Sequence, residues 1–167
     1  MGFHKKTDPI TGRTIDLDKT YKGIIKPAVE AAGYRCLRAD EIQHAGLIDV
    51  PMYDWLLKAG VVIADLSTLN ANAFFELGVR YALRPYTTIV IAEDGFRNPF
   101  DTNHITVRTF RHDGEALDFE VVASFRKALS EAIVAITAQS KVDSPVFTFL
   151  YNLQRPTVTT VDDNVAA

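Results

Sequence analysis

The stretch from Val61 to Arg84, VVIADLSTLNANAFFELGVRYALR, decides the fold that this sequence predicts. It opens with an apolar run, Val61–Ala64, that ends at Asp65. A run this short and this apolar is typical of a strand buried on both faces of a parallel sheet. After a polar turn, apolar residues recur at helical spacing over Ala71–Leu83, and Pro85 ends the pattern. The stretch therefore predicts a buried strand, a turn and a helix.

The flanking sequence continues the alternation of strands and helices. The predicted strands are Tyr34–Leu37, Gly60–Leu66, Thr87–Ala92 and, as a possible edge strand, Ile105–Arg111. The predicted helices begin at a cap on Asp16 or Asp18 and run to Ala32, and then cover Pro51–Lys58, Ala71–Leu83 and Phe119–Thr137. We expect Pro27 to kink or break the first helix and Gly33 to end it. This alternation predicts an α/β fold with a parallel sheet and helices on both faces.

A strand before the first helix is missing from this pattern. Met1-Gly2-Phe3 is at most its last few residues. In the flavodoxin-like strand order, that first strand is central. One interpretation, which the adjacency of consecutive strands favours, is that upstream residues of a longer protein supply it. The other is that the fold lacks this strand and fills the gap from another chain.

Composition limits the function classes. The chain has 167 residues, which suits one domain with a sizeable core, and 47% of them are hydrophobic. A net charge of −3 argues against a broad nucleic-acid-binding face. No apolar run is long enough for a membrane span, and the start of the chain is unlike a signal peptide. The single Cys36 fits a cytoplasmic protein, and the four scattered histidines make a bound transition metal improbable.

The candidate site follows the buried strand, because ligands of open parallel sheets bind beyond the carboxyl ends of the strands. Asp65 stands there and either contacts a ligand or only caps the turn. Ser67, Asn70 and Asn72 offer hydrogen bonds to a sugar or a phosphate, although Asn70 also suits a helix N-cap. Glu76 lies about one turn into the helix, where it acts as a catalytic carboxylate, forms a salt bridge (with Arg80 at i+4) or is solvated.

Residues elsewhere extend this site. Arg38 and Asp40 follow the strand Tyr34–Leu37 at the same edge and are candidates to line the cleft. Lys5, with Lys6 and Arg13, forms either a phosphate-binding patch or a solvated face. Phe3, where the first strand would end, is a further candidate for substrate contact. Trp55 and Tyr53 are interpreted mainly as helix packing, and Cys36 as inert core.

ADLSTLNANAFFELGVRYAL resembles the signature of the nucleoside 2-deoxyribosyltransferase-like and TIR-like superfamily of flavodoxin-like domains. The pieces KTDPITGRTIDLDKTY, IKPAVEAAG, RADE, PMYDWLLKA and NPFD are similar to the TIR-like domains of bacterial conflict and signalling proteins, including those associated with TPR repeats. The resemblance spans roughly residues 1–150. It implies a flavodoxin-like three-layer sandwich with a mainly parallel sheet whose first strand is missing or truncated.

The resemblance also implies an activity. In enzymes of this superfamily a helix glutamate attacks or stabilises the anomeric carbon while an N-glycosidic bond breaks, and Glu76 matches that position. Asp65 and Asn70 or Asn72 match positions that contact the sugar or the base. Nicotinamide leaves a cationic ring as a neutral group and needs no strong general acid. The expectation is an N-glycosidase acting on NAD or a related nucleotide in bacterial defence or signalling, with that nucleotide as ligand and no permanently bound cofactor.

Two rival functions stay open at this point. The chain is alternatively a non-catalytic nucleotide-sensing or oligomerisation domain, or a structural scaffold. Residues 1–140 are expected to form the domain and 141–167 a tail or linker to another module, with the last residues disordered. Val146, Phe147, Phe149 and Leu150 are expected to pack on the sheet or dock a partner. An open sheet edge and this apolar segment favour a homo-oligomer.

Overall fold

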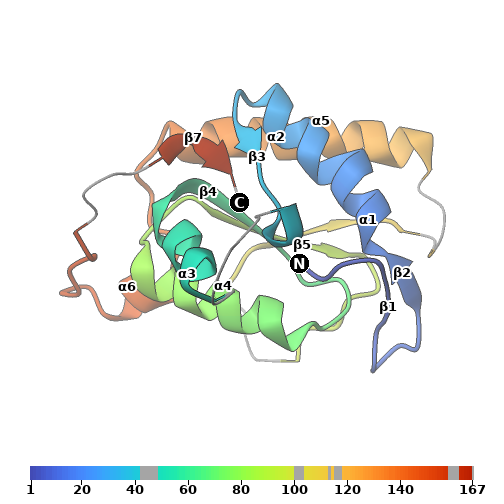
Figure 1. The fold of residues 1–167 in the computed structure, drawn as a ribbon, viewed down its shortest axis with the longest axis horizontal. Helices are drawn as coiled ribbons and strands as arrows, with labels where there is room; N and C mark the ends of the chain where they lie inside the picture. The colour runs from blue at the N-terminus through green and yellow to red at the C-terminus, as the bar shows by residue number, and fades with distance from the viewer. Residues whose placement is uncertain (42–48, 100–103, 113, 115–117, 158–161, 167) are drawn as a thin grey trace.

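The computed structural model describes residues 1–41, 49–99, 104–112, 114, 118–157 and 162–166 (Figure 1). In chain order, the elements are β1 (Lys5–Thr7), β2 (Thr14–Asp16), α1 (Leu17–Thr20), a π-helical turn η1 (Tyr21–Ile25), α2 (Lys26–Ala31), β3 (Arg35–Cys36), a 3-10 turn η2 (Ala39–Glu41), α3 (Asp49–Lys58), β4 (Ala59–Asp65), α4 (Ala71–Leu83), β5 (Thr88–Glu93), β6 (Val107–Phe110), α5 (Phe119–Thr137), α6 (Pro145–Phe149) and β7 (Asp162–Ala166).

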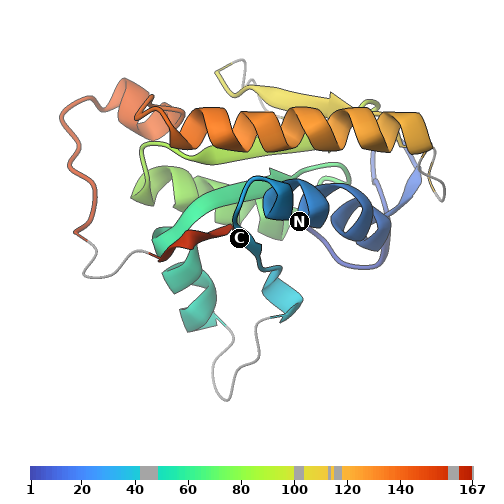
Figure 2. The ribbon, with the colours of Figure 1, turned by 90° about the horizontal axis from the view of Figure 1, so that it is seen from above.

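A five-stranded sheet with the order β3-β7-β4-β5-β6 forms the centre of the fold, and all of its pairings are parallel. Every residue of β4 and β5 is buried, as the apolar runs predict. α5 and the α1–η1–α2 helix cover one face, and α3 and α4 lie on the other (Figure 2). The predicted α/β class with a parallel sheet is confirmed, and the arrangement is compatible with a flavodoxin-like fold.

Residues of β4 alternate between two apolar cores. Val61 and Ile63 pack with η1, α2 and α5 on one face, whereas Ala64 packs with Leu77 and Tyr81 of α4 on the other. Successive residues of a strand point to opposite faces, so one short apolar run serves both layers. The contacts of Ala64 with Leu77 and Tyr81 hold α4 against the carboxyl half of β4. They thereby position the turn between β4 and α4.

The first helix is irregular just before Pro27, where a kink or a break is predicted, but its backbone stays helical from Leu17 to Ala31. Asp16 caps α1 by accepting a hydrogen bond from the backbone of Lys19. The π-helical turn η1 ends just before Pro27, which lies in the first turn of α2 and has no N–H to donate to an earlier carbonyl. Gly33 follows α2 with a φ of 87°, a conformation that glycine adopts without a steric penalty.

β7 occupies the place of the missing strand. In the described part of residues 1–16, β1 and β2 form a separate antiparallel hairpin, and no strand there joins the parallel sheet. The gap between β3 and β4 is filled instead by Asp162–Ala166, which pairs in parallel with both neighbours. The expectation that the last residues are disordered is therefore wrong for 162–166, because the exposed edges of β3 and β4 supply their hydrogen-bonding partners.

The segment after α5 also folds back on the domain. The Ser144 hydroxyl donates to the Tyr81 carbonyl at 2.7 Å and caps α6, which holds α6 against α4. Val146 packs against the core on the α4 side, while Phe149 and Leu150 are exposed. Among the described helices, none combines the length and the apolar character that crossing a membrane requires.

Candidate functional site

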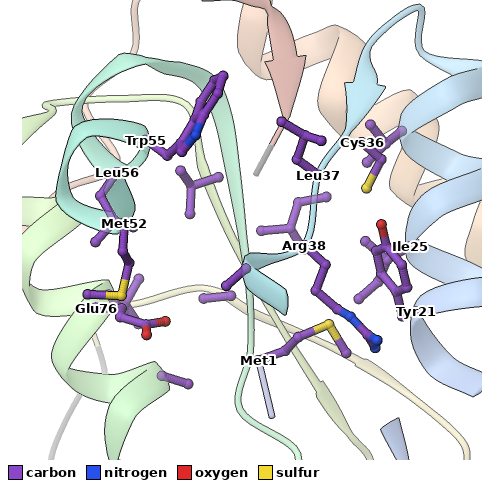
Figure 3. A pocket seen from close by; sticks show the side chains of 17 residues that line it. Met1, Tyr21, Ile25, Cys36, Leu37, Arg38, Met52, Trp55, Leu56 and Glu76 are labelled. Carbon is purple, nitrogen blue, oxygen red and sulfur yellow. The ribbon is translucent and has the colours of Figure 1, made fainter. Parts of the chain in front are cut away.

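A pocket opens between the carboxyl ends of β3 and β4, beyond the end of β7 (Figure 3). The space between its walls, with the open solvent at its mouth included, is about 830 Å³. Its described walls come from η1 (Tyr21, Ile25), α2 (Val29), the end of β3 and the residues after it (Cys36, Leu37, Arg38, Ala39), α3 (Met52, Trp55, Leu56), β4 (Val62, Ile63, Ala64), α4 (Ala73, Glu76, Leu77) and Met1.

Glu76 is the one carboxylic acid among the described residues that line this pocket. On α4, Ala73, Leu77 and Tyr81 face the core and Phe75 faces solvent, which leaves position 76 at the border between them. Its carboxylate extends from α4 into the pocket, with Met52 on one side and Met1 across from it (Figure 3). Burial raises the pKa of Glu76 above its usual 4.5, and the amino group of Met1 partly offsets this.

Arg38 forms the opposite wall and is already paired with acids. Its guanidinium donates two hydrogen bonds of 2.6 Å to Asp40 and one of 2.7 Å to Asp18. It also lies over the ring of Tyr21, 4.4 Å from the ring centroid, and near the ring of Phe3 at 5.3 Å. The hydrogen bond from Arg38 lowers the pKa of Asp18 to about 2. Arg38 thus closes the pocket wall with its charge shared between two carboxylates.

Asp65 and Ser67 build the turn after β4 and do not line the pocket. The backbone N–H and the hydroxyl of Ser67 donate to one carboxylate oxygen of Asp65, at 2.9 and 2.5 Å. The same hydroxyl accepts from the backbone N–H of Glu93 at 2.9 Å and so ties the turn to β5. Asp65 is buried, and burial raises its pKa. Of the two predicted roles of Asp65, the turn-capping one is confirmed.

The remaining candidates lie around the pocket at different depths. Asn70 caps α4 by accepting from the backbone of Asn72, as the N-cap interpretation predicts, and Asn72 itself is exposed. Lys5 is exposed on β1. The structure therefore brings Glu76 and Arg38 into one pocket, with Asp40 and Phe3 joined to it through Arg38. Asp65, Ser67 and Asn70 form the turn and cap that precede α4.

Several pocket residues were not predicted as such. Trp55 and Met52 of α3 and Tyr21 of η1 form much of the apolar wall. Their helical spacing shows that they face a core, but it does not show which space they border. Cys36 also lines the pocket, and burial raises the pKa of its thiol to about 11. That pKa keeps the thiol protonated and inert at neutral pH, consistent with its interpretation as core.

Neither the metal-ligating side chains of the described residues nor the comparisons with known proteins identify a cofactor. Among the described residues, no three His, Cys, Asp or Glu side chains are arranged to hold a metal ion. No protein-family model matches the chain, and none of the curated proteins or solved structures matches it either. These comparisons therefore add no evidence on function to that from the pocket.

Proposed function

We propose that this protein is an N-glycosidase that cleaves the bond between ribose and base in NAD or a related nucleotide, with Glu76 as the catalytic carboxylate. The observation that carries the proposal is the position of Glu76. Its carboxylate enters a mainly apolar pocket at the carboxyl end of a parallel sheet, where such folds bind ligands. A role in bacterial defence or signalling inside the cytoplasm follows from the resemblance of residues 1–150 and belongs to the same proposal.

The chemistry of the pocket favours this reaction over general acid–base hydrolysis. Breaking a ribosyl–nitrogen bond develops oxocarbenium character, which an adjacent carboxylate stabilises or traps as a covalent intermediate. With Glu76 as the one acid in the described lining, a leaving group that must be protonated has no evident donor. Nicotinamide departs from a cationic ring as a neutral molecule, so its release needs no such donor. A cationic N-glycoside is therefore the best match to this pocket.

The walls fit the base and ribose better than the phosphates. Trp55 and Tyr21 provide aromatic surface, and Met52 and Leu56 add apolar surface, against which a planar base can pack. The Arg38 guanidinium already has two carboxylate partners. We therefore place the base and ribose inside the pocket and the phosphates at its mouth.

The test is direct measurement of base release. The protein is incubated with NAD, nucleoside monophosphates and deoxynucleosides, and free bases are separated by chromatography. We expect nicotinamide release by the wild type and its loss in Glu76→Gln. Glu131→Gln, which changes an exposed glutamate of α5, is the matched control and should retain full release. Release that survives Glu76→Gln would remove Glu76 from the chemistry.

The alternative is a nucleotide-sensing domain that binds without turnover. One observation favours it: the described lining lacks a second acid that could deprotonate an attacking water while Glu76 stabilises the sugar. Calorimetric titration of the wild type with NAD distinguishes the two. Saturable binding without any base release supports the sensor, and absence of both binding and release supports a scaffold.

A further inference from the structure

The sign of the charge around the pocket is decided at the wall that Arg38 forms. Among the described lining residues, Arg38 and Glu76 are the ones with a charged side chain, and they extend toward the pocket from opposite sides (Figure 3). The amino group of Met1 lies near Glu76 and opposes its charge. An arginine without acidic neighbours would repel a positively charged ligand. Whether the pocket accepts a cation therefore depends on what surrounds the Arg38 guanidinium.

Two carboxylates surround that guanidinium. Its Nε and Nη2 atoms donate to the two oxygens of Asp40, both at 2.6 Å, and its Nη1 atom donates to Asp18 at 2.7 Å. Hydrogen bonds of this kind favour the ionised acid. The bond from Arg38 lowers the pKa of Asp18 to about 2, so this acid is ionised at neutral pH. The wall thus has two negative charges for one positive charge, and its sign is opposite to that of Arg38 alone.

The described groups next to this wall leave its sign unchanged. Glu41 accepts a hydrogen bond from the Tyr21 hydroxyl at 2.7 Å, and the Lys26 ammonium lies 3.9 Å from the same carboxylate, so these two charges balance. His4 contacts Asp18 through its backbone N–H and its ring, but its side chain is 82% exposed, where solvent and salt screen any charge. The excess of negative charge therefore comes from Asp18 and Asp40.

We infer that Asp18 and Asp40 make the pocket selective for a positively charged ring over a neutral ring of the same shape. Neither acid lines the pocket, so both act through space on a ligand that the apolar walls contact. This selectivity rests on the proposed function for the class of its ligand, a pyridinium substituted at the ring nitrogen, and adds the residues that select it. Selection by charge and cleavage by Glu76 are separate properties, because selection needs only binding.

The test uses two probes that have the same shape and differ in charge. Nicotinamide methylated at its ring nitrogen is a cation. Its neutral isostere, meta-toluamide, has a carbon in place of that nitrogen and keeps the methyl and carboxamide groups. The dissociation constant of each probe is measured by calorimetric titration of the full chain. Wild-type protein should bind the cation about fivefold more tightly, as expected for one unit of charge in a partly solvated site.

The variants change the charge of the wall in single steps. Asp40→Asn and Asp18→Asn each remove one negative charge and keep an oxygen that accepts from Arg38. Each should weaken binding of the cation about fivefold, and the double variant about 25-fold, so that its preference is reversed. The affinity for meta-toluamide should stay within about twofold in all of them, because a neutral ring gains little from the charge of the wall.

Asp54→Asn is the matched control. It removes one carboxylate from an exposed ion pair with Lys58 on α3, and neither residue lines the pocket. The same change of charge at this position should leave the affinities for both probes unchanged. Binding of meta-toluamide also reports that each variant is folded, and the two single variants decide the matter if the double variant does not fold.

Three results would overturn the inference. Equal losses for both probes in the Asp18 and Asp40 variants would show that these acids only hold the wall in shape. Wild-type protein that binds the two probes equally, or binds neither, would show that the pocket does not select by charge. Base release is not measured here, so the two proposals fail separately. Charge selectivity without cleavage leaves this inference in place and removes the proposed reaction, whereas cleavage without charge selectivity does the reverse.

Discussion

At the scale of single residues, Glu76 and Arg80 lie one turn apart on α4 but have different roles: Glu76 lines the pocket, and Arg80 holds neighbouring elements together. Their spacing allows an ion pair, but the Arg80 guanidinium points the other way. It is fully buried and donates to the carbonyls of Leu56, Ala59 and Thr87 at 2.8 to 3.2 Å. The alternative that pairs Glu76 with Arg80 is therefore wrong, because the carbonyls of α3, of the start of β4 and of the residue before β5 occupy the donors. Glu76 keeps its carboxylate for the pocket.

Glu76→Gln should leave the fold at least as stable as the wild type at neutral pH. Burial raises the folded-state pKa of Glu76 above its ordinary 4.5, so the ionised form is the disfavoured one. The stability linked to this group is present below pH 4.5 and is lost as pH rises through the raised pKa. Urea melts at pH 4 and pH 7.5 should show the variant gaining on the wild type at the higher pH only. A variant less stable at both values would contradict this.

At the scale of elements, the segment before α6 fastens β5 and α4 together through one acid. The Asp143 carboxylate accepts from the backbone N–H of Thr88 at 2.9 Å, while Ser144 beside it bonds to Tyr81. Its other oxygen is buried and has no hydrogen-bond partner among the described residues. Burial raises the pKa of Asp143 to about 6. The start of β5 is thus held by an acid that is costly to ionise.

Asp143→Asn should stabilise the protein above pH 6 and make little difference at low pH. Because the folded-state pKa is raised from 3.8 to about 6, wild-type stability is lost as pH rises through that interval. The gain should be about 1–2 kcal/mol after allowance for partial exposure and for the nearby Arg80. Thermal melts from pH 3.5 to pH 8 measure it. Asp54→Asn, at the exposed i,i+4 pair with Lys58, is the control and should give a flat difference.

At the scale of the whole molecule, the central strand beside the pocket comes from the far end of the sequence. Only 22 residues lie between Cys36, the end of β3, and Ala59, the start of β4, yet the strand between them in the sheet starts at Asp162. The order β3-β7-β4 places this strand between the two strands whose carboxyl ends border the pocket.

Val165→Pro tests how much β7 contributes to the stability of the fold. Val165 pairs with Arg35 inside the sheet, where proline removes a ladder hydrogen bond and does not fit between two strands. We expect a loss of about 1–3 kcal/mol in the free energy of unfolding, measured in urea. Thr157→Pro, at an exposed position before β7, should cost little. Equal stability of the two variants would show that β7 does not contribute to the folded core.

The sequence alone determined the elements whose pattern is local. Ala71–Leu83 and Phe119–Thr137 are helices with the predicted bounds, and the apolar runs became β4 and β5, because periodicity and double burial are written in consecutive residues. Glu76 could be chosen from its place after a buried strand. Only the tertiary structure decided that Asp162–Ala166 is a strand, since DDNVA has no strand pattern and gains its partners from β3 and β4. Likewise, only the tertiary structure shows that Asp18 and Asp40 neutralise Arg38. It also shows that Asp65 is buried in the turn after β4, which the spacing of residues in the sequence cannot reveal.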